Sequence, residues 1–461
     1  MSLLLLVLHG TNSRRPFFRA ERANNLTTVR AKDYGKPVAL LLQSESTGFD
    51  FQWFLIDAYG MTKTNENLDI ATKLVHAGER GPAPVGRPVS TPIYASAIFT
   101  YESMREMDEV FAGERRGFVY TRYGNPTNTA LERAMCHVED GAFANSYSTG
   151  MAAVHAALFA CELSPGATVL ASQDLYGATT NLLNVVFGSF GIKTVHADFS
   201  NLNRLQTLAA ELKPRVLLAE TISNPLLKVC DIQACADIAH EVGARFIVDN
   251  TFASPFLCQP LKHGADMVVH SATKFLGGHG DTMGGVVITR DDFDSVALIS
   301  VMKLVGGVLS VWDAHEILRG LKTLAVRQER QSRNAEELAR HLQNDARIGR
   351  VHYPGLSADR AEVVQRILRQ PFGGALVSIE LADNSREAAF SFMDALGLVV
   401  RSTSLGDVFS SVLHPATASH RDAAPARRRE LGISDGLVRI SVGIEKSADI
   451  IADIDQALSH I

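Results

Sequence analysis

The stretches Phe246-Ile-Val-Asp-Asn-Thr251 and Val269-His-Ser-Ala-Thr-Lys274 together decide the fold of this chain. Each carries the end of a short apolar run, Phe246–Val248 in the first and Met267–Val269 at the start of the second, and then turns polar, which predicts the end of a buried strand. Such runs are typical of a parallel sheet that helices cover on both faces. Ligands of open α/β sheets gather at the carboxyl ends of the strands. We therefore expect a binding site where these two stretches end.

Strands and helices alternate on both sides of these stretches. This pattern predicts βαβ units that form a mostly parallel sheet with helices on both faces. The expected helices are Met151–Cys161, Leu202–Leu212 and Cys235–Val242, and the expected strands are Ala167–Ala171, Lys193–Ala197, Arg215–Glu220, Arg245–Asp249, Met267–His270 and Gly285–Thr289.

The C-terminal part has a different pattern. The charge-rich segment Ala325–Leu342 has helical spacing, which predicts a long helix that enters a second domain. Strands are expected at Ala375–Leu381 and Leu437–Val442, and a closing amphipathic helix at Ala448–Leu458. These elements predict a smaller α+β domain at the C-terminus.

Length and composition describe an ordinary globular chain of 461 residues, 46% hydrophobic and 21% charged. The net charge of −5 argues against a nucleic-acid partner, because such proteins carry a basic face. The apolar run Leu3–Leu8 is far too short to cross a membrane. Five scattered cysteines argue against a disulfide scaffold and against structural zinc. A reducing cytoplasm is the simplest setting for such a chain.

Asp249 and Lys274 are the residue types that pyridoxal phosphate (PLP) chemistry requires at such a site. A lysine amine forms a Schiff base with the cofactor aldehyde, and a carboxylate beside the pyridine nitrogen keeps the ring protonated as an electron sink. Ser271 and Thr273, which flank the lysine, could give hydroxyls to the cofactor phosphate. Taken singly, Lys274 is equally well explained as an exposed loop lysine and Asp249 as a turn residue.

A phosphate-binding segment is expected at Ser148-Thr-Gly-Met151, before an alanine-rich helix. Backbone N–H groups at a helix N-terminus face an anion, and Gly150 lets the backbone come close. The same segment is also explained as a common helix cap. Tyr176 follows a strand and could stack on a pyridine ring, although a lone aromatic residue more often belongs to the core.

Several strings occur in order along the chain: Tyr120-Thr-Arg-Tyr-Gly-Asn-Pro-Thr127, Ser148-Thr-Gly-Met151, Glu220-Thr-Ile-Ser-Asn-Pro225, Val248-Asp-Asn-Thr251, Ser271-Ala-Thr-Lys274 and Leu437-Val-Arg-Ile-Ser-Val-Gly443. They resemble the trans-sulfuration enzymes, a PLP-dependent family that includes cystathionine γ-synthase, cystathionine γ- and β-lyases, methionine γ-lyase and the O-acylhomoserine sulfhydrylases. The resemblance runs from about Ala71 to the C-terminus. It implies the type I, aspartate aminotransferase-like fold of PLP-dependent transferases, with a mostly parallel seven-stranded sheet in the large domain.

The resemblance implies roles for the residues around the reacting centre. Lys274 would be the Schiff-base lysine and would carry protons between Cα, C4′ and Cβ. Asp249 would pair with the pyridine nitrogen, and Asn224 would lie near the ring hydroxyl and the substrate. Tyr176 would stack on the ring and assist the leaving group. Arg439 would clamp the substrate α-carboxylate, for which a planar guanidinium is suited.

Other matching residues are implied to serve the cofactor phosphate and the assembly. Ser404 would lie beside the cofactor lysine and contact the substrate. Tyr120, also expected to take part in catalysis, and Arg122 would reach the phosphate of a neighbouring subunit. A homodimer would then be the minimum active unit, and a homotetramer is expected. The phosphate of the chain's own cofactor would be held by Gly150, Met151, Ser271 and Thr273.

These observations predict a division of the chain into segments. Residues 1–60 lack periodicity, and we expect an atypical extension, disordered or produced by an upstream start, with the working protein beginning at Met61. Residues 61–118 would form an N-terminal arm against the neighbouring subunit. The PLP-binding large domain would be 119–315, and the small domain 316–461.

The implied reaction is γ-elimination or γ-replacement on sulfur amino acids and homoserine derivatives. Removal of the α-proton leaves a carbanion that is delocalised into the cofactor ring, and loss of the γ-substituent gives a vinylglycine-type intermediate. Release of an α-keto acid and ammonia completes elimination, whereas attack of a thiol at Cγ completes replacement. The lysine base must lose its charge near neutral pH, which burial can bring about.

Within the family, Gly278-His-Gly-Asp281 and Ser404-Leu-Gly-Asp407 look most like methionine γ-lyase, which is the predicted activity. That lyase typically carries a cysteine two residues after the stacking tyrosine, where this chain has Ala178. Cystathionine-handling members often have a glutamate where this chain has Phe409, which predicts a less polar distal pocket. O-acetyl- or O-succinylhomoserine sulfhydrylase and cystathionine γ-synthase remain the alternatives.

Other classes of protein fit the sequence less well. A nicotinamide dehydrogenase needs a glycine-rich loop between a strand and a helix, and Gly277-Gly-His-Gly280 opens no clear helix. No histidines show a familiar metal-ligand spacing, so no metal site is predicted. A catalytically inactive binding protein of the PLP fold would not need Lys274, Asp249 and Arg439 together.

Overall fold

The computed structural model describes residues 2–3, 19–23, 26–30, 42–43, 88–291 and 295–461, in two compact units, Met1–Pro88 and Val89–Ile461. Most of the predicted extension 1–60, and the predicted start at Met61, lie outside the described residues. The strands of the first unit form two antiparallel pairs, β1 (Ser2–Leu3) with β4 (Leu42–Gln43) and β2 (Arg19–Ala23) with β3 (Leu26–Arg30).

A seven-stranded sheet lies at the centre of the second unit, with the order β5-β11-β10-β9-β8-β6-β7. Neighbouring strands from β10 to β7 are parallel, and only β11 runs against its two neighbours. The predicted mostly parallel sheet is therefore confirmed. Its strands are β5 (Phe143–Tyr147), β6 (Thr168–Ser172), β7 (Lys193–Ala197), β8 (Val216–Glu220), β9 (Arg245–Asp249), β10 (Met267–Ser271) and β11 (Gly285–Thr289).

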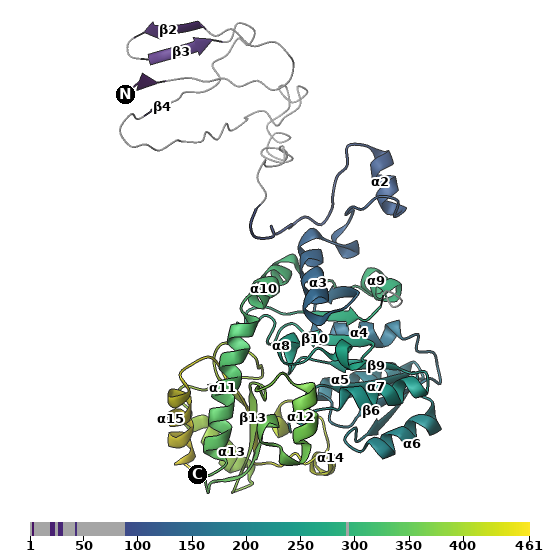
Figure 1. The fold of residues 1–461 in the computed structure, drawn as a ribbon, viewed down its shortest axis with the longest axis vertical. Coiled ribbons are helices and arrows are strands. Elements are labelled where there is room, and N and C mark those ends of the chain that lie inside the picture. The colour runs from purple at the N-terminus through teal and green to yellow at the C-terminus, as the bar shows by residue number, and fades with distance from the viewer. Residues whose placement is uncertain (1, 4–18, 24–25, 31–41, 44–87, 292–294) are drawn as a thin grey trace. The chain divides into compact units, whose positions relative to one another are not determined.

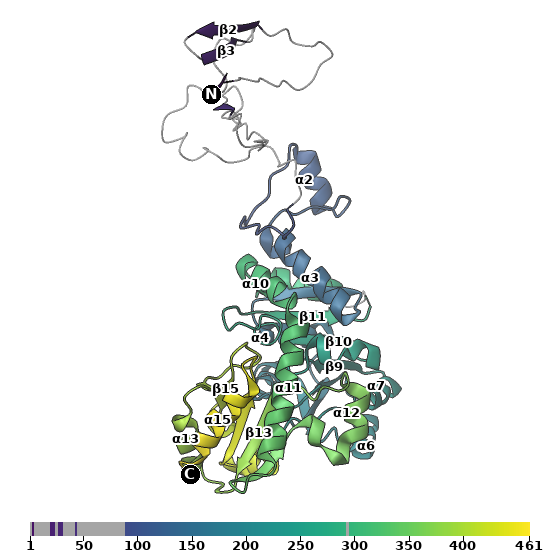
Figure 2. The ribbon, with the colours of Figure 1, turned by 60° about the vertical axis from the view of Figure 1, so that its left-hand side comes forward.

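Helices cover both faces of this sheet, as the apolar strands predict. Along β9, Phe246 and Val248 pack into one hydrophobic core and Ile247 packs into another, because successive side chains point to opposite faces. Figures 1 and 2 show the helices around these strands. The first core takes side chains from α3 (Pro126–Glu139), α6 (Leu202–Leu212) and α7 (Ile232–Glu241), and the second from α4 (Gly150–Ala160) and α9 (Ser295–Val305).

A second sheet of five strands, in the order β12-β13-β16-β15-β14, forms the C-terminal part. In β16, Val438 and Ile440 pack into the core under the helices, whereas Arg439 between them points to the other face. The strands are β12 (Ile348–His352), β13 (Leu376–Leu381), β14 (Val400–Arg401), β15 (Ser411–Leu413) and β16 (Leu437–Ser441), and the packing helices are α11 (Leu324–Leu342), α13 (Arg386–Ala395) and α15 (Ser447–Leu458).

The long helix α11 connects the regions of the two sheets, as predicted. It contacts α8 on the side of the larger sheet and β12, β13 and α15 in the C-terminal part, and Figures 1 and 2 both show it beside β13. The other α-helices among the described residues are α2 (Met104–Phe111), α5 (Gly177–Asn181), α8 (Ser254–Leu257), α10 (Val311–Leu321), α12 (Ala361–Ile367) and α14 (Pro425–Glu430).

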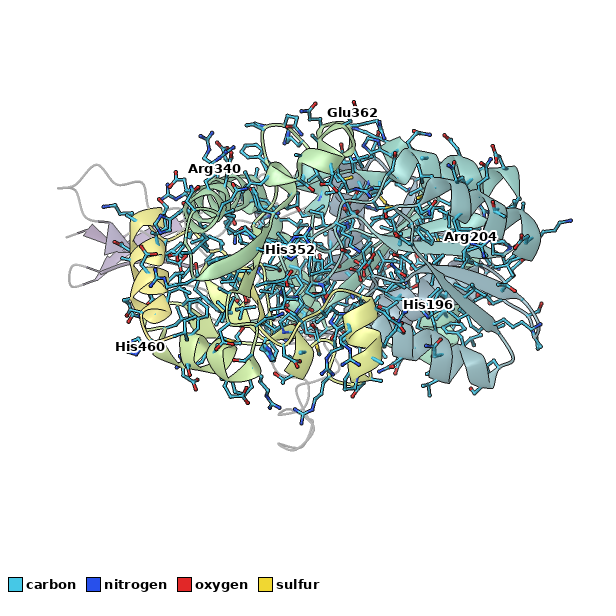
Figure 3. The ribbon with its side chains drawn as sticks, turned by 90° about the horizontal axis from the view of Figure 1, so that it is seen from below. His196, Arg204, Arg340, His352, Glu362 and His460 are labelled. Carbon is cyan, nitrogen blue, oxygen red and sulfur yellow. The ribbon has the colours of Figure 1, made fainter. Side chains whose placement is uncertain are left out.

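Many charged side chains, though not those of the cavity, lie at the outside of this unit. Figure 3 shows Arg340 and Glu362 at its rim, and Arg340 pairs there with Glu336 one helical turn away. Such exposed pairs add little to stability. Among the described residues, no helix has both the length and the apolar character that a bilayer crossing requires.

Candidate active site

A cavity of about 620 Å³ lies at the carboxyl ends of β8, β9 and β10. Glu220, Asp249 and Ser271 are the last residues of these strands, and all three line the cavity, as expected for a parallel α/β sheet. The five-stranded sheet contributes Leu413 and Arg439 to the wall. The predicted site residues that line the cavity are Gly150, Met151, Tyr176, Asn224, Asp249, Ser271, Thr273, Lys274 and Arg439.

Lys274 lies in a turn directly after β10, where its N–H donates to the carbonyl of Ser271 (3.2 Å). Its Nζ donates to Oγ of Ser404 (3.2 Å), so Ser404 touches the lysine from the C-terminal part. Burial, and then the positive charge of Arg439, lower the pKa of Lys274, while Asp407 opposes this shift. The amine therefore loses its proton more easily than an exposed lysine, as a base or an amine nucleophile requires.

Asp249 presents a partly buried carboxylate to the same cavity. Its Oδ1 accepts a hydrogen bond from the N–H of Thr251 (2.9 Å). Burial raises the pKa of Asp249, and the hydrogen bonds from Thr251 and the charge of His270 oppose the rise. A cation held beside this carboxylate favours its ionised form, and a protonated pyridine ring is such a cation.

A buried polar network, which the sequence did not predict, supports the segment after β9. His270 Nε2 and Glu139 Oε1 lie 2.5 Å apart, and both side chains are almost fully buried. Asn250 donates to the same Oε1 (3.0 Å) and accepts from the hydroxyl of Thr221 (2.7 Å). The network joins α3, β10 and the segments that follow β8 and β9. It therefore fixes the backbone that carries Asp249.

Free backbone N–H groups meet a serine side chain where α4 begins. The Oγ1 of Thr149 caps the helix, and the N–H groups of Gly150 and Met151 have no acceptor within it. A Cβ at position 150 would lie 2.7 Å from Cβ of Ser271, so the close approach requires glycine. Helix N–H groups beside a serine hydroxyl suit a phosphate group. Thr273 also lines the cavity, but its hydroxyl is bonded to the backbone of Gly284.

Arg439 is a buried cation with an unused donor. Its Nη1 donates to Oδ1 of Asn224 (2.7 Å) and its Nη2 to the carbonyl of Ser404 (3.5 Å). Its Nε has no partner among the described residues, although the side chain is only 3% exposed. Burial lowers the pKa of Arg439 to about 10, which leaves it charged at neutral pH. A carboxylate is the ligand that such a guanidinium lacks.

Tyr176 lies at the rim of the cavity with 41% of its surface exposed. It caps α5 without a side-chain hydrogen bond, and its N–H donates to Oε1 of Glu220 (2.6 Å). Glu220 and Thr251 also line the cavity, although no role was predicted for either from the sequence. Glu220 is the last residue of a predicted strand, as Asp249 is. Its position at a strand end could therefore have indicated it as a site residue.

Tyr120 and Arg122 lie outside the wall of this cavity. Arg122 donates to the carbonyl of Lys303, and its guanidinium lies 5.3 Å from the ring centre of Tyr120 and 4.9 Å from that of Tyr123. Tyr120 is 41% exposed. A single chain thus does not bring these two residues to the other predicted site residues.

The two positions that separate family members also lie outside the wall of the cavity. Ala178 is the second residue of α5, and the neighbouring Thr179, not Ala178, lines the cavity. Phe409 is within van der Waals reach of a Cβ placed at Gly280 and is partly buried. In one chain, therefore, neither side chain borders the space beside Lys274.

The comparison with known proteins agrees with this geometry. Residues 71–459 match the family described as Cys/Met metabolism PLP-dependent enzyme. The chain belongs to this family. The predicted cofactor, pyridoxal phosphate, and the predicted enzyme class are thereby confirmed.

This chain aligns with almost the whole length of relatives that carry out Cys/Met metabolism. An L-methionine gamma-lyase of Fusobacterium nucleatum subsp. polymorphum is 38% identical over 394 residues, 85% of this chain and 98% of the relative. A cystathionine gamma-synthase of Mycobacterium bovis is 39% identical over 390 residues, 84% and 96% of the two chains.

A solved structure confirms the predicted type I fold. The putative O-acetylhomoserine (thiol)-lyase of Campylobacter jejuni subsp. jejuni superposes with a TM-score of 0.77 at 31% identity, over 81% of this chain and 96% of that chain. That structure contains N'-pyridoxyl-lysine-5'-monophosphate, a lysine joined to the cofactor.

Proposed function

We propose that this chain catalyses γ-elimination or γ-replacement on sulfur amino acids and homoserine derivatives, with methionine γ-lyase as the closest activity. One observation carries the proposal: Lys274, Asp249 and Arg439 all line one cavity, and the buried Nε of Arg439 has no partner among the described residues. This set can hold PLP at one end and an amino-acid carboxylate at the other. The names of the two relatives support the reaction class.

The residues present fit the cofactor. The N-terminal N–H groups of α4, at Gly150 and Met151, and the hydroxyl of Ser271 would hold the phosphate. Asp249 would accept from the protonated ring nitrogen, and Lys274 would bind the aldehyde carbon. When bound, PLP supplies an electron sink for the negative charge left at Cα after the α-proton is removed.

Substrate binding and proton transfer are carried out by side chains of the protein. Arg439 binds the substrate α-carboxylate, which supplies the partner that its Nε lacks. Lys274 Nζ would take the α-proton, deliver it to C4′ and, once neutral again, take a proton from Cβ. Ser404 Oγ, which accepts from Nζ, orients the amine. The Tyr176 hydroxyl gives a proton to the leaving group, and Asn224 keeps the guanidinium of Arg439 in place.

We propose a homodimer as the minimum active unit and a homotetramer as the full assembly. Tyr120 and Arg122, which do not line the chain's own cavity, would then serve the phosphate site of a neighbour. The proposed domains are the arm 61–118, the large domain 119–315 and the small domain 316–461. The described residues contain no disulfide, which supports a cytoplasmic setting.

Covalent attachment of PLP is expected to proceed at a lower pH than it does at an exposed lysine. Burial and Arg439 lower the pKa of Lys274, so more of the amine is neutral at a given pH. Arg439→Gln removes one of these causes, and the pKa of Lys274 should rise. The rate of covalent attachment is measured by rapid mixing of PLP with the apo-protein at a series of pH values, followed by absorbance. The plot of this rate against pH should be shifted to higher pH in the variant. An unchanged or lower profile would contradict this assignment of the charges.

A substrate panel tests the proposed function. We expect purified protein to be yellow and to release α-ketobutyrate from L-methionine without added thiol. L-cystathionine and O-acetyl- and O-succinylhomoserine are assayed beside it, each alone, with sulfide and with L-cysteine, and homocysteine and cystathionine are also measured. Homocysteine formed only from an acylhomoserine plus sulfide would make the protein a sulfhydrylase, and cystathionine formed from an acylhomoserine plus cysteine a synthase. A colourless protein inert toward all of them would contradict the proposal.

A further inference from the structure

Glu220 places a second carboxylate beside Asp249. The two are the last residues of β8 and β9 and are partners in the parallel register, so their side chains lie on the same face of the sheet. Glu220 is 8% exposed and lines the cavity. Burial and the neighbouring Asp249 raise the pKa of Glu220. Burying a carboxylate is costly unless its oxygens find hydrogen-bond partners.

Both oxygens of Glu220 are used, and each contacts a different site residue. Oε1 accepts the N–H of Tyr176 (2.6 Å), and Oε2 accepts the N–H of Asn224 (3.2 Å). These hydrogen bonds oppose the rise of the pKa of Glu220, because they favour the ionised form. Tyr176 and Asn224 lie on separate loops, after β6 and after β8, and the carboxylate ties these loops together.

The effect of the second contact reaches Arg439. The side chain of Asn224 accepts from Arg439 Nη1 (2.7 Å), so a shift of the Asn224 backbone moves the guanidinium. The negative charge of Glu220 also opposes the lowering of the pKa of Arg439 by burial. The carboxylate of Glu220 therefore contacts Tyr176 directly and is linked to Arg439 through Asn224.

We propose that Glu220 is a positioning residue for the reaction: its two oxygens hold Tyr176 and Asn224 at once, and so set the ring-stacking side chain and the Arg439 clamp relative to each other. The inference rests on the proposed function for the roles of Tyr176 and Arg439. A carboxylate that only closes a turn would have no effect on substrate binding once the protein is folded.

Glu220→Gln is the first test. Glutamine has almost the same volume as glutamate and keeps one acceptor oxygen. Its NH₂ group faces the other backbone N–H, so one of the two loops loses its hydrogen bond. A small misplacement of catalytic groups can lower the rate by about 100-fold. We expect kcat/KM to fall by about 10- to 100-fold. The matched control is Glu211→Gln, at an exposed position of α6, which should behave as wild type.

A double-mutant cycle separates positioning from scaffolding. The readout is the dissociation constant of an unreactive amino acid without a γ-substituent, followed by the absorbance of the bound cofactor. In the wild-type background Glu220→Gln should weaken this binding about 10-fold or more. In an Asn224→Ala background the same change should weaken it less than about twofold, because Arg439 has already lost its contact. Equal losses in both backgrounds would overturn the proposal.

The test stays informative if one variant folds poorly or if the substrate assignment fails. Glu220→Asp keeps the charge but shortens the side chain by one methylene, so it reaches only one loop and should show the same binding loss. Thermal unfolding and far-UV circular dichroism identify variants that are folded. The binding readout needs no turnover, so an inert wild type would sink the proposed function and leave this test intact. Folded Glu220→Gln and Glu220→Asp proteins with wild-type amino-acid affinity would refute the role of Glu220.

Discussion

Lys274→Ala is expected to lose essentially all turnover, about 10⁴-fold or more, because one side chain is both the anchor of the cofactor and the base. The variant should still bind PLP, since the N-terminus of α4, Ser271 and Asp249 are untouched. It should bind the cofactor without a covalent link. Denaturation followed by gel filtration should separate all PLP from the variant, whereas borohydride-treated wild type should keep it.

The control for this variant is Lys262→Ala, which removes an exposed lysine of the same unit. Its activity and its cofactor content should match those of the wild type. If Lys274→Ala retained turnover within tenfold of the wild type, another amine would have to serve as base. The assignment of Lys274 would then be wrong, whatever the substrate.

Arg439→Ala should chiefly weaken the binding of the amino-acid carboxylate. Truncating one partner of a buried, hydrogen-bonded charge pair costs about 2–5 kcal/mol. The guanidinium is buried, its Nε has no partner among the described residues, and burial leaves its pKa at about 10, so it binds as a cation. We expect the dissociation constant of the amino acid to rise while PLP stays bound. Equilibrium titration of holoenzyme with an unreactive amino acid measures the change.

Arg439→Lys is the informative companion of this variant. Lysine keeps the positive charge but lacks the planar fork, so it cannot hold Asn224 and a carboxylate in the same geometry. Its affinity should lie between those of the wild type and Arg439→Ala. If both variants bound the amino acid as tightly as the wild type, the carboxylate clamp would lie elsewhere in the cavity.

Strands and helices with strong local signals could be predicted closely from the sequence. The expected ranges of β7, β9, β11 and α6 match the structure at both ends. The helix expected to begin at Cys235 begins at Ile232, because Asp231 caps it by accepting from the N–H of Ala234. The strand β5 was not predicted, since Phe143–Tyr147 mixes apolar with polar residues that are satisfied only in the folded chain.

The candidate site was predictable where the chemistry is local. Lys274 and Asp249 follow strands, and the topology brings strand ends together. The same reasoning could not find the contacts of Glu220, since its partners Tyr176 and Asn224 come from two loops whose approach depends on the whole sheet. It also could not tell that Phe409 lies outside the cavity wall, because a loop side chain has no periodicity to indicate its direction.

The alternation along β16 has a consequence for natural variants of this protein. Arg439 shares its strand with Val438 and Ile440, whose side chains belong to the hydrophobic core beneath α11, α13 and α15. A methyl group lost or gained at either neighbour displaces the backbone on which the guanidinium is mounted. Substitutions that look conservative at Val438 or Ile440 can thus change the affinity of the site for an amino acid, although every residue that lines the cavity stays the same. Variant interpretation for this chain therefore has to include the interior of its C-terminal sheet.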